Sequence, residues 1–435
     1  MKMTMKAAAA AVMAVCAASA AHAAGFMLTE QSAGALGRAY AGVGVDGTDI
    51  SGVYYNPATM TLHPGTKIQA GFVAVGLDLA FEGSGSADDV NYDGVTENGQ
   101  YNTQAIPHGY ISHQLTDSMW IGLAMTVPFG MGTEYKDDWK LGNRGISAEV
   151  LTFDFNPNVA WKVSDKLSLG AGMSIQYAAA DLKMQDKPLG LSVNGEVDAD
   201  SIAWGFNVGV MWSPLENLRF GLSYRSRVNH NADGDFTLSG GDAIVDGALG
   251  TLGLAQGVPY DATATISTPA WAMATAAWDV NDLLSLYATF RWTDWSSFDT
   301  LNIKTSALDR IPGKNGVKTV ENHWQDTYLV SVGADLRFTN WWTFRAGIGY
   351  ETSAVDDPKY RTAIIPDADR LWLALGSSFK ASENMQIDVS AAWLHGIGER
   401  NLWNTDGSDG KTPQEVGKFE NLDAYLFGVQ LVYKF

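Results

Sequence analysis

Apolar and polar residues alternate with a period of two from Thr66 to the end of the chain. The segments 167–177, 218–227 and 328–338 show the pattern most clearly, each with one apolar face and one face of polar residues and glycine. Successive side chains of a strand point to opposite faces of a sheet, so each segment is predicted to be a strand with one apolar face.

Fourteen such segments follow one another along the chain. Strands of about ten residues that are apolar outside and polar inside are typical of a transmembrane β-barrel, and bacterial barrels have an even number of strands. We therefore predict an all-β fold, an antiparallel barrel of about 14 strands with both ends on the periplasmic side. The segments start near residues 66, 102, 119, 146, 166, 199, 217, 261, 283, 326, 341, 370, 385 and 423.

The connections alternate between short turns and long loops. Short turns rich in Asp, Asn, Ser and Pro are expected at one end of a barrel, the periplasmic end, and long loops at the extracellular end. The short turns are 116–118, 164–165, 214–216, 280–282, 339–340 and 381–383. The long loops are 82–101, 130–145, 185–198, 239–259, 304–325, 356–369 and 400–421.

Tryptophans recur beside the short turns, which predicts an aromatic girdle at the periplasmic interface. They are Trp120, Trp161, Trp212, Trp278, Trp341 and Trp342. The chain also ends in an alternating strand with a terminal aromatic, Phe435. A soluble β-sandwich would explain the alternation, but it would not explain the girdle, the unequal loops and this terminus together.

Residues 1–23 have the features of a cleaved signal peptide. Lys2 and Lys6 precede an apolar run of 15 residues, and Ala21-His22-Ala23 provides small residues for cleavage. The run is shorter than the roughly 20 residues of a spanning helix. Cys16 could indicate a lipoprotein, but Val15 is bulkier than the residue expected before a lipidated cysteine. We expect export and insertion into the bacterial outer membrane.

Composition excludes several classes of function. The formal net charge of −19 argues against a nucleic-acid partner, which requires a basic surface. The seven histidines are scattered without ligand spacing, and no hydrolase or zinc-protease motif is present. Gly42, Gly44 and Gly47 satisfy the spacing of a dinucleotide-binding loop but follow no predicted strand. We expect no enzyme activity, no cofactor and no metal.

Residues 24–62 do not alternate and are rich in glycine with a few aromatics. A barrel of this size has a lumen too wide for its own strand side chains to fill. The sequence therefore predicts three parts: a signal peptide at 1–23, an N-terminal plug at 24–62, and the barrel at 63–435.

Several motifs resemble the FadL family of outer-membrane transporters for long-chain fatty acids and other hydrophobic compounds. In the plug, Ala24-Gly25-Phe26, Gly37-Arg38-Ala39-Tyr40 and Asn56-Pro57-Ala58 match that family's N-terminal hatch. The barrel matches are Tyr224-Arg225-Ser226, 292–296, 342–345, 365–367 with Asp369-Arg370, and His395-Gly396. The resemblance covers essentially the whole mature chain, and its specificity comes from the ensemble of motifs.

The resemblance implies passive, ligand-gated uptake of long-chain fatty acids through the lumen. It implies that Phe26, Asn56, Pro57 and Ala58 belong to the hatch and ligand site, and that Phe435 is recognised by the barrel-assembly machinery. Outer-membrane lipid and lipopolysaccharide are the expected surroundings, and we expect a monomer.

Four arginines are candidates to bind a fatty-acid carboxylate. The alternation places Arg225, Arg227, Arg291 and Arg345 on the inward face, where a guanidinium group could hold a carboxylate by charge-assisted hydrogen bonds. The alternative for each of them is an internal salt bridge with one of the many acidic residues, because buried charges are usually paired.

Pro128 near the end of the third strand is the candidate exit. Proline cannot donate to a β-ladder, and the nearby Gly130 and Gly132 weaken the strand further. The resemblance implies an inward kink here and a lateral gap in the wall, through which cargo reaches the outer leaflet. We hypothesise that movement around Asn56-Pro57-Ala58 links the lumen to this gap. The alternative is a frayed strand end before a loop.

In the loop 239–259, Ile244, Val245, Leu249 and Leu252 recur at helical spacing. An amphipathic helix could present them as an outer capture groove, or it could pack them against neighbouring loops.

Two alternatives to fatty-acid uptake remain. One is uptake of aromatic or aliphatic hydrocarbons by the same route, which needs no cationic site. The other is a structural or adhesive surface barrel, in which a plug and a wall gap would have no use. A general porin is disfavoured, because the plug would obstruct a diffusion pore.

Overall fold

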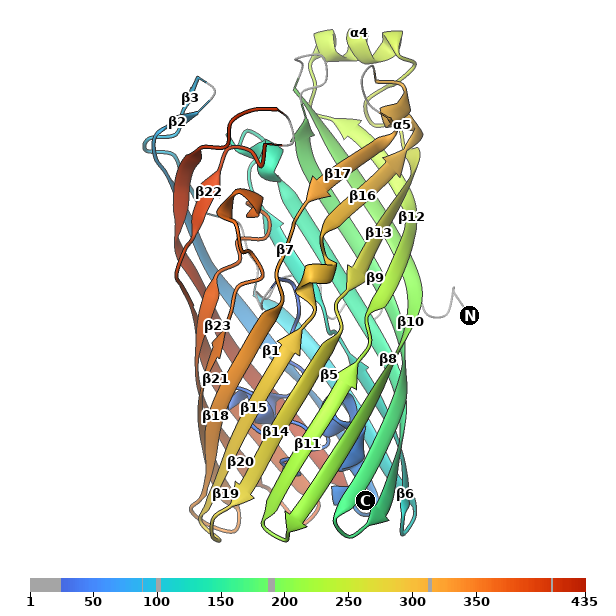
Figure 1. Ribbon diagram of the computed structural model, residues 1–435, viewed down its shortest axis with the longest axis vertical. Helices are drawn as coiled ribbons and strands as arrows, with labels where there is room; N and C mark the ends of the chain where they lie inside the picture. Colours follow the sequence, from blue (N-terminus) through green and yellow to red (C-terminus); the bar gives the residue numbers. More distant parts are fainter. Residues whose placement is uncertain (1–24, 88, 99–102, 187–191, 312–314, 408–409) are drawn as a thin grey trace.

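The computed structural model describes residues 25–87, 89–98, 103–186, 192–311, 315–407 and 410–435. The predicted signal peptide lies outside the described residues. The described part of the chain folds into a closed antiparallel β-barrel of fourteen strands, which confirms the predicted fold class (Figure 1). No helix in this part of the chain is long and apolar enough to cross a membrane.

Each barrel strand pairs antiparallel with the next along the chain, and β1 closes the ladder by pairing with β23. Several strands are interrupted and therefore carry two labels. In order, the strands are β1 (Thr66–Gly83), β5 (Gln104–Thr116), β6 (Met119–Thr126) with β7 (Gly130–Glu134), β8 (Ser147–Ser164), β9 (Leu167–Asp186), β10 (Val193–Leu215), β11 (Leu218–Arg225) with β12 (Val228–Ser239), β13 (Tyr260–Thr268) with β14 (Trp271–Asp279), β15 (Leu284–Thr293) with β16 (Thr300–Thr305), β17 (Val317–Glu321) with β18 (Thr327–Arg337), β19 (Trp342–Glu351), β20 (Asp369–Lys380), β21 (Met385–Ile397) and β23 (Glu415–Lys434).

The remaining elements are short and lie in the plug or the upper loops, except η4, which stands at the interruption between β15 and β16 (Figure 1). The helices are α2 (Ala33–Leu36), α3 (Gly52–Tyr55), η1 (Pro57–Leu62), η2 (Gly142–Arg144), α4 (Ala243–Thr251), η4 (Trp295–Ser297), α5 (Ser306–Asp309) and η5 (Pro358–Tyr360). The small strands are β2 (Ser86–Ala87), β3 (Val90–Asn91), β4 (Thr96–Asn98) and β22 (Asn401–Trp403).

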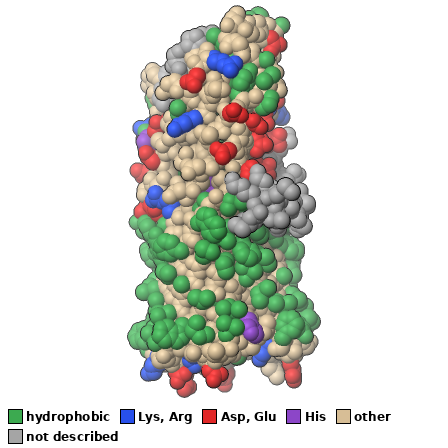
Figure 2. Space-filling view, turned by 90° about the vertical axis from the view of Figure 1, so that its right-hand side faces the viewer, with side chains coloured by type: hydrophobic (Ala, Val, Ile, Leu, Met, Phe, Trp, Pro, Cys, Tyr) green, Lys and Arg blue, Asp and Glu red, His purple; other side chains and the backbone are tan. Residues whose placement is uncertain are grey.

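An apolar band surrounds the lower half of the barrel. On β10, alternate residues from Trp204 to Trp212 are large, apolar and exposed, whereas Asn207 and Met211 between them are buried. Figure 2 shows the same arrangement over one whole face, with charged side chains gathered above the band and along the lower rim. This is the distribution that a barrel wall needs, because lipid tails cover the band and water meets both ends.

Of the six tryptophans predicted for the girdle, four are exposed, Trp342 is half-buried and Trp120 is buried. Trp161, Trp212, Trp278 and Trp341 are exposed beside the lower turns. Trp120 was wrongly assigned to the girdle: it is buried, and its Nε1 donates a hydrogen bond to the carbonyl of His63 at 3.0 Å. The cause is strand parity, since Trp120 shares the inward face of β6 with Ala124.

The strands run further into the upper region than the alternation predicted. The predicted loop 130–145 contains β7, the loop 304–325 contains β17, and β10 begins at Val193. These upper parts lie above the apolar band, so their outward residues are polar and the sequence there lacks the strand signal.

Residues 25–62, which we call the plug, fill the lower part of the lumen (Figure 1). The helix α2 contacts β20, β21 and β23, whereas η1 contacts the opposite wall at β8, β9 and β10. Glycines in the wall allow this close approach. A Cβ on Gly170 would lie 2.4 Å from the Ala58 nitrogen, and one on Gly347 would lie 2.2 Å from the Arg38 carbonyl group. The plug is therefore packed against two opposite walls.

Candidate functional site

The third strand is interrupted at Pro128. Its lower part, β6, pairs with β5 only as far as Met125↔Gly109, while its upper part, β7, pairs with β8 from Gly130↔Leu151 onward. Among the described residues, 104–108 of β5 have no ladder partner on this side. We call this place the wall break. The strand resumes as β7, so Pro128 does not mark a frayed end before a loop.

The N-terminal end of the plug lies against the wall break. The Leu28 nitrogen donates to the Pro128 carbonyl at 2.8 Å, and the Gly130 nitrogen donates to the Phe26 carbonyl at 2.9 Å. Met27 and Phe129 form an isolated antiparallel bridge between these two bonds. Residues 26–28 thus act as a short strand paired with the interrupted segment.

The motif Asn56-Pro57-Ala58 does not touch the wall break and lies against β9 and β10. The Asn56 Nδ2 donates to the Val210 carbonyl on β10 at 3.0 Å, and its Oδ1 accepts from the Ala58 nitrogen at 3.2 Å. Pro57 follows as the first residue of η1. This motif fixes the lower plug to the wall at β9 and β10, and the segment that touches the wall break is 26–31.

An apolar cavity occupies the lumen above the plug. Its volume is about 60 Å³. Its lining contains no lysine or arginine, and Asn322 and Thr362 are its only residues with polar side chains. The lining residues are Phe26, Met131, Val150, Ala180, Leu182, Met184, Val197, Ala199, Ala232, Ala264, Ile266, Phe298, Leu301, Val320, Asn322, Thr362, Ile364 and Ile365.

Phe26 connects this cavity to the wall break. Its ring lies 4.8 Å from that of Trp295, 5.3 Å from that of Phe298, and 6.0 Å from that of Phe129, all edge to face. Phe298 lines the cavity, whereas Phe129 belongs to the interrupted strand. The Phe26 ring therefore lies between the cavity and the wall break.

Three of the candidate arginines are buried in ion pairs. Arg225 lies 2.7 Å from Asp154, and Arg291 lies 2.7 Å from Glu351. Arg345 lies 3.1 Å from Asp388 and also contacts Asp335. These guanidinium groups balance carboxylates of the protein, as the salt-bridge alternative predicted.

The inward assignment of Arg227 was wrong. Arg227 is exposed and pairs with Asp294 at 2.5 Å. It follows Ser226 in the interruption between β11 and β12, where the Ser226 hydroxyl accepts from the Phe206 nitrogen. The alternation does not continue through such an interruption, so parity along the strand gave the wrong face.

The predicted helix in the loop 239–259 is present as α4, which begins after the capping side chain of Asp242. Val245 and Leu249 are buried among neighbouring apolar side chains, Leu252 is half-buried, and Ile244 is 70% exposed. Most of the apolar face is therefore packed inward, at the top of an apolar cluster that extends through Ile266 to the cavity.

The alternation gave no signal for two plug residues beside the wall break, because neither belongs to a repeating pattern. Gln31 is buried, with its carboxamide on the backbone of Val127. Glu30 is also buried, and neither of its carboxylate oxygens has a hydrogen-bond partner in the described structure. Burial raises the pKa of the Glu30 carboxyl to about 7.

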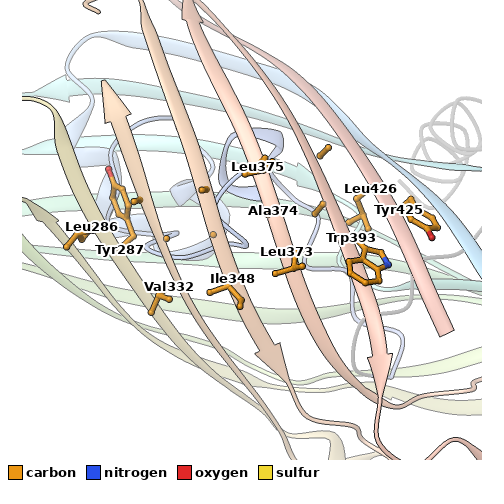
Figure 3. A pocket seen from close by; sticks show the side chains of 16 residues that line it. Leu286, Tyr287, Val332, Ile348, Leu373, Ala374, Leu375, Trp393, Tyr425 and Leu426 are labelled. Atoms are coloured by element: carbon orange, nitrogen blue, oxygen red, sulfur yellow. The ribbon is translucent and has the colours of Figure 1, made fainter. Parts of the chain in front are cut away.

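Besides the cavity in the lumen, an apolar groove lies on the outer wall (Figure 3). Leu286, Val332, Ile348 and Leu373 point outward around it, and small residues such as Ala346 leave the space between them. These residues belong to the apolar band on the outside of the barrel, so the groove is part of the outer surface and not of the lumen. Among the described residues, no group of three or more His, Cys, Asp or Glu side chains could hold a metal ion.

Comparison with known proteins places the chain in a family. Residues 14–435 match the family model described as "Outer membrane protein transport protein (OMPP1/FadL/TodX)". A long-chain fatty acid transport protein of Escherichia coli O6:H1 is 27% identical, over 95% of this chain and 94% of the relative.

Solved structures resemble the fold over similar lengths. A Pseudomonas aeruginosa FadL homologue has a TM-score of 0.83 at 24% identity, covering 95% of this chain and 100% of that one. The Pseudomonas putida toluene transporter TodX has a TM-score of 0.68 at 15% identity, with the same coverage.

Proposed function

Because the chain belongs to the OMPP1/FadL/TodX family of outer-membrane transport proteins, we propose that it takes up long-chain fatty acids and releases them through the wall break. The family consists of transporters of hydrophobic compounds and not of enzymes, in agreement with the expected class and location. The choice of fatty acids follows the name of the 27% identical relative.

The observation that carries the proposed route is the position of Phe26. A cargo molecule in the apolar cavity would rest on this ring, and the other edge of the ring meets Phe129 at the wall break. Displacing residues 26–31 would join the cavity to the unpaired edge of β5. The cargo would then leave sideways into the outer leaflet without crossing the polar lower lumen.

Uptake of labelled oleate by cells that lack their own transporter tests the cargo. We expect uptake with this protein, and equal oleate entry with and without it would reject fatty acids. The route is tested with Gly130→Val, which adds bulk to β7 beside Leu28, and with Gly132→Val two residues further along the same strand. Slower uptake at unchanged amounts of folded protein is expected, and full uptake by both variants would reject the lateral route.

Hydrocarbon uptake is a second candidate, favoured by a specific observation. The cavity lining has no cation, and Arg225, Arg291 and Arg345 are engaged by acidic side chains. A carboxylate in the cavity would therefore lack a partner, whereas an uncharged hydrocarbon needs none. Uptake of hexadecane or toluene without oleate uptake would decide for this candidate.

A further inference from the structure

Gln31 occupies the place where the barrel ladder lacks a partner. Extending the β5–β6 register past Gly109↔Met125 would put Val127 opposite Pro107. Proline has no N–H group and cannot complete that pair. Prolines therefore stand on both edges of the wall break, Pro107 on β5 and Pro128 on the third strand.

The side chain of Gln31 supplies what the ladder lacks at Val127. Its Nε2 donates to the Val127 carbonyl at 2.6 Å, and its Oε1 accepts from the Val127 nitrogen at 3.3 Å. A carboxamide carries the same donor and acceptor as a peptide group, so one side chain replaces one residue of a neighbouring strand.

Gln31 also reaches the other edge of the wall break. Its backbone carbonyl accepts a hydrogen bond from the Tyr110 hydroxyl on β5 at 2.5 Å. Tyr110 pairs with Ala124 directly below the point where the β5–β6 ladder ends. One fully buried residue thus joins the plug, β5 and the third strand.

We propose that Gln31 is a clasp that holds the wall break closed, and that its release opens the exit. This inference rests on the proposed lateral route. Gln31 is a positioning residue, because it acts by holding the backbone of Val127 and the adjacent segment 26–28. The backbone hydrogen bonds that Phe26 and Leu28 form with the third strand lie next to the bonds of Gln31 to Val127.

The test compares two glutamines that are both buried and both bonded to the plug or the wall through their carboxamides. Gln31→Met keeps the length of the side chain and removes both bonds to Val127. The matched control is Gln69→Met. Gln69, on β1, is buried and lies opposite Tyr110 in the β1–β5 ladder, but its side chain accepts from the Ile50 nitrogen at 2.9 Å and donates to Gln430, and not to the backbone of Val127. Tyr110→Phe is a milder third variant, which removes a single hydroxyl.

Hydrogen exchange of the purified full-length protein gives the first readout. In Gln31→Met, amides of 26–31 and 127–131 should exchange on the order of tenfold faster, because the three hydrogen bonds of the buried carboxamide, two to Val127 and one to the Leu28 carbonyl, are lost. Gln69→Met should leave these segments unchanged and affect residues near Ile50. Tyr110→Phe should give a smaller increase in 26–31. Unchanged exchange at 127–131 in Gln31→Met, or equal acceleration in Gln69→Met, would overturn the clasp.

Release of a bound fluorescent C18 polyene fatty acid into lipid vesicles gives the second readout. Release should be several-fold faster from Gln31→Met than from the wild type or Gln69→Met. Faster exchange with unchanged release would overturn the role in opening. A wild type that binds no probe would count against the proposed cargo, while the exchange experiment would still decide on the clasp.

Discussion

The plug is attached to the barrel in two different ways on its two sides. On the side of α2, Arg38 lies 2.9 Å from Asp335 of β18, and Gln430 of β23 donates to Asp49 at 2.9 Å. At the wall break, residues 26–31 form no ion pair with the wall among the described residues. Their contacts are backbone bonds, the Gln31 carboxamide, packed rings and single side-chain hydrogen bonds, one of which the Arg291 guanidinium donates to the Thr29 hydroxyl at 2.9 Å. The charged side is suited to permanent anchorage. The side at the wall break can release one bond at a time.

Breaking the charged side should have the largest effect. Arg38→Met leaves Asp46 buried without its cation and leaves Asp335 with only the longer contact to Arg345 at 3.5 Å; removing one partner of a buried ion pair typically costs about 3–5 kcal/mol. We expect protease cleavage within the plug and increased permeability to small polar solutes. Cleavage is read from mass spectra of the folded protein, and permeability from single-channel conductance. A plug as protected as in the wild type would show that these ion pairs are not the anchor.

At the wall break, Phe26→Ala should come next. Loss of a buried aromatic ring costs about 3 kcal/mol or more, and here it removes the floor of the cavity. We expect faster release of the fluorescent fatty acid with the lower plug still in place. Phe419→Ala is the control, since it removes an equally buried ring from a separate cluster. If both variants release the probe equally fast, the ring at Phe26 has no special position on the route.

Glu30 makes the side at the wall break sensitive to pH. Its pKa is about 7 in the packed plug, against an ordinary value of 4.5. Between these values the packed plug binds more protons than the exposed segment does. The stabilising contribution is therefore complete below about pH 4.5 and is lost as the pH rises through 7, at a cost of roughly 3 kcal/mol.

Hydrogen exchange of residues 26–31 at pH 5, 6, 7 and 8 measures this effect. Beyond the intrinsic pH dependence of exchange, the wild type should lose protection toward pH 8, and Glu30→Gln should not. Residues 33–36 of α2 provide the internal reference, because Glu30 does not hold them. Equal pH dependence of wild type and variant would exclude Glu30 as the titrating group.

The barrel wall and the contacts of the plug were not equally predictable from the sequence. The wall could be predicted, because the alternation repeats in every strand and each repeat adds to the same signal. Trp120 and Arg227 show where that signal fails: it does not tell which face is inward near a turn, and it does not continue through an interruption. Pro128 could be recognised as the point where the third strand is interrupted, because a proline has no N–H group to donate to the ladder.

The partners of the wall break could not be predicted. Gln31 and Val127 are 96 positions apart, and Phe26 meets a ring more than 260 residues away. No local pattern relates such residues, and only the closure of the barrel brings them together. For the same reason the inward parity of Arg225, Arg291 and Arg345 could not reveal which carboxylates would pair with them.

Arg227→Met should have the smallest effect, and it tests the comparison from the opposite direction. Arg227 carries the same charge as Arg38, but it is 42% exposed at the side chain and its partner Asp294 is partly exposed. Exposed pairs contribute about 1 kcal/mol or less, because water solvates either charge when the other is removed. Plug protection and oleate uptake should therefore stay within about twofold of the wild type. If uptake instead falls as far as in Arg38→Met, Arg227 would have to contact the cargo during passage, and burial of the ion pair would not be what separates anchorage from release.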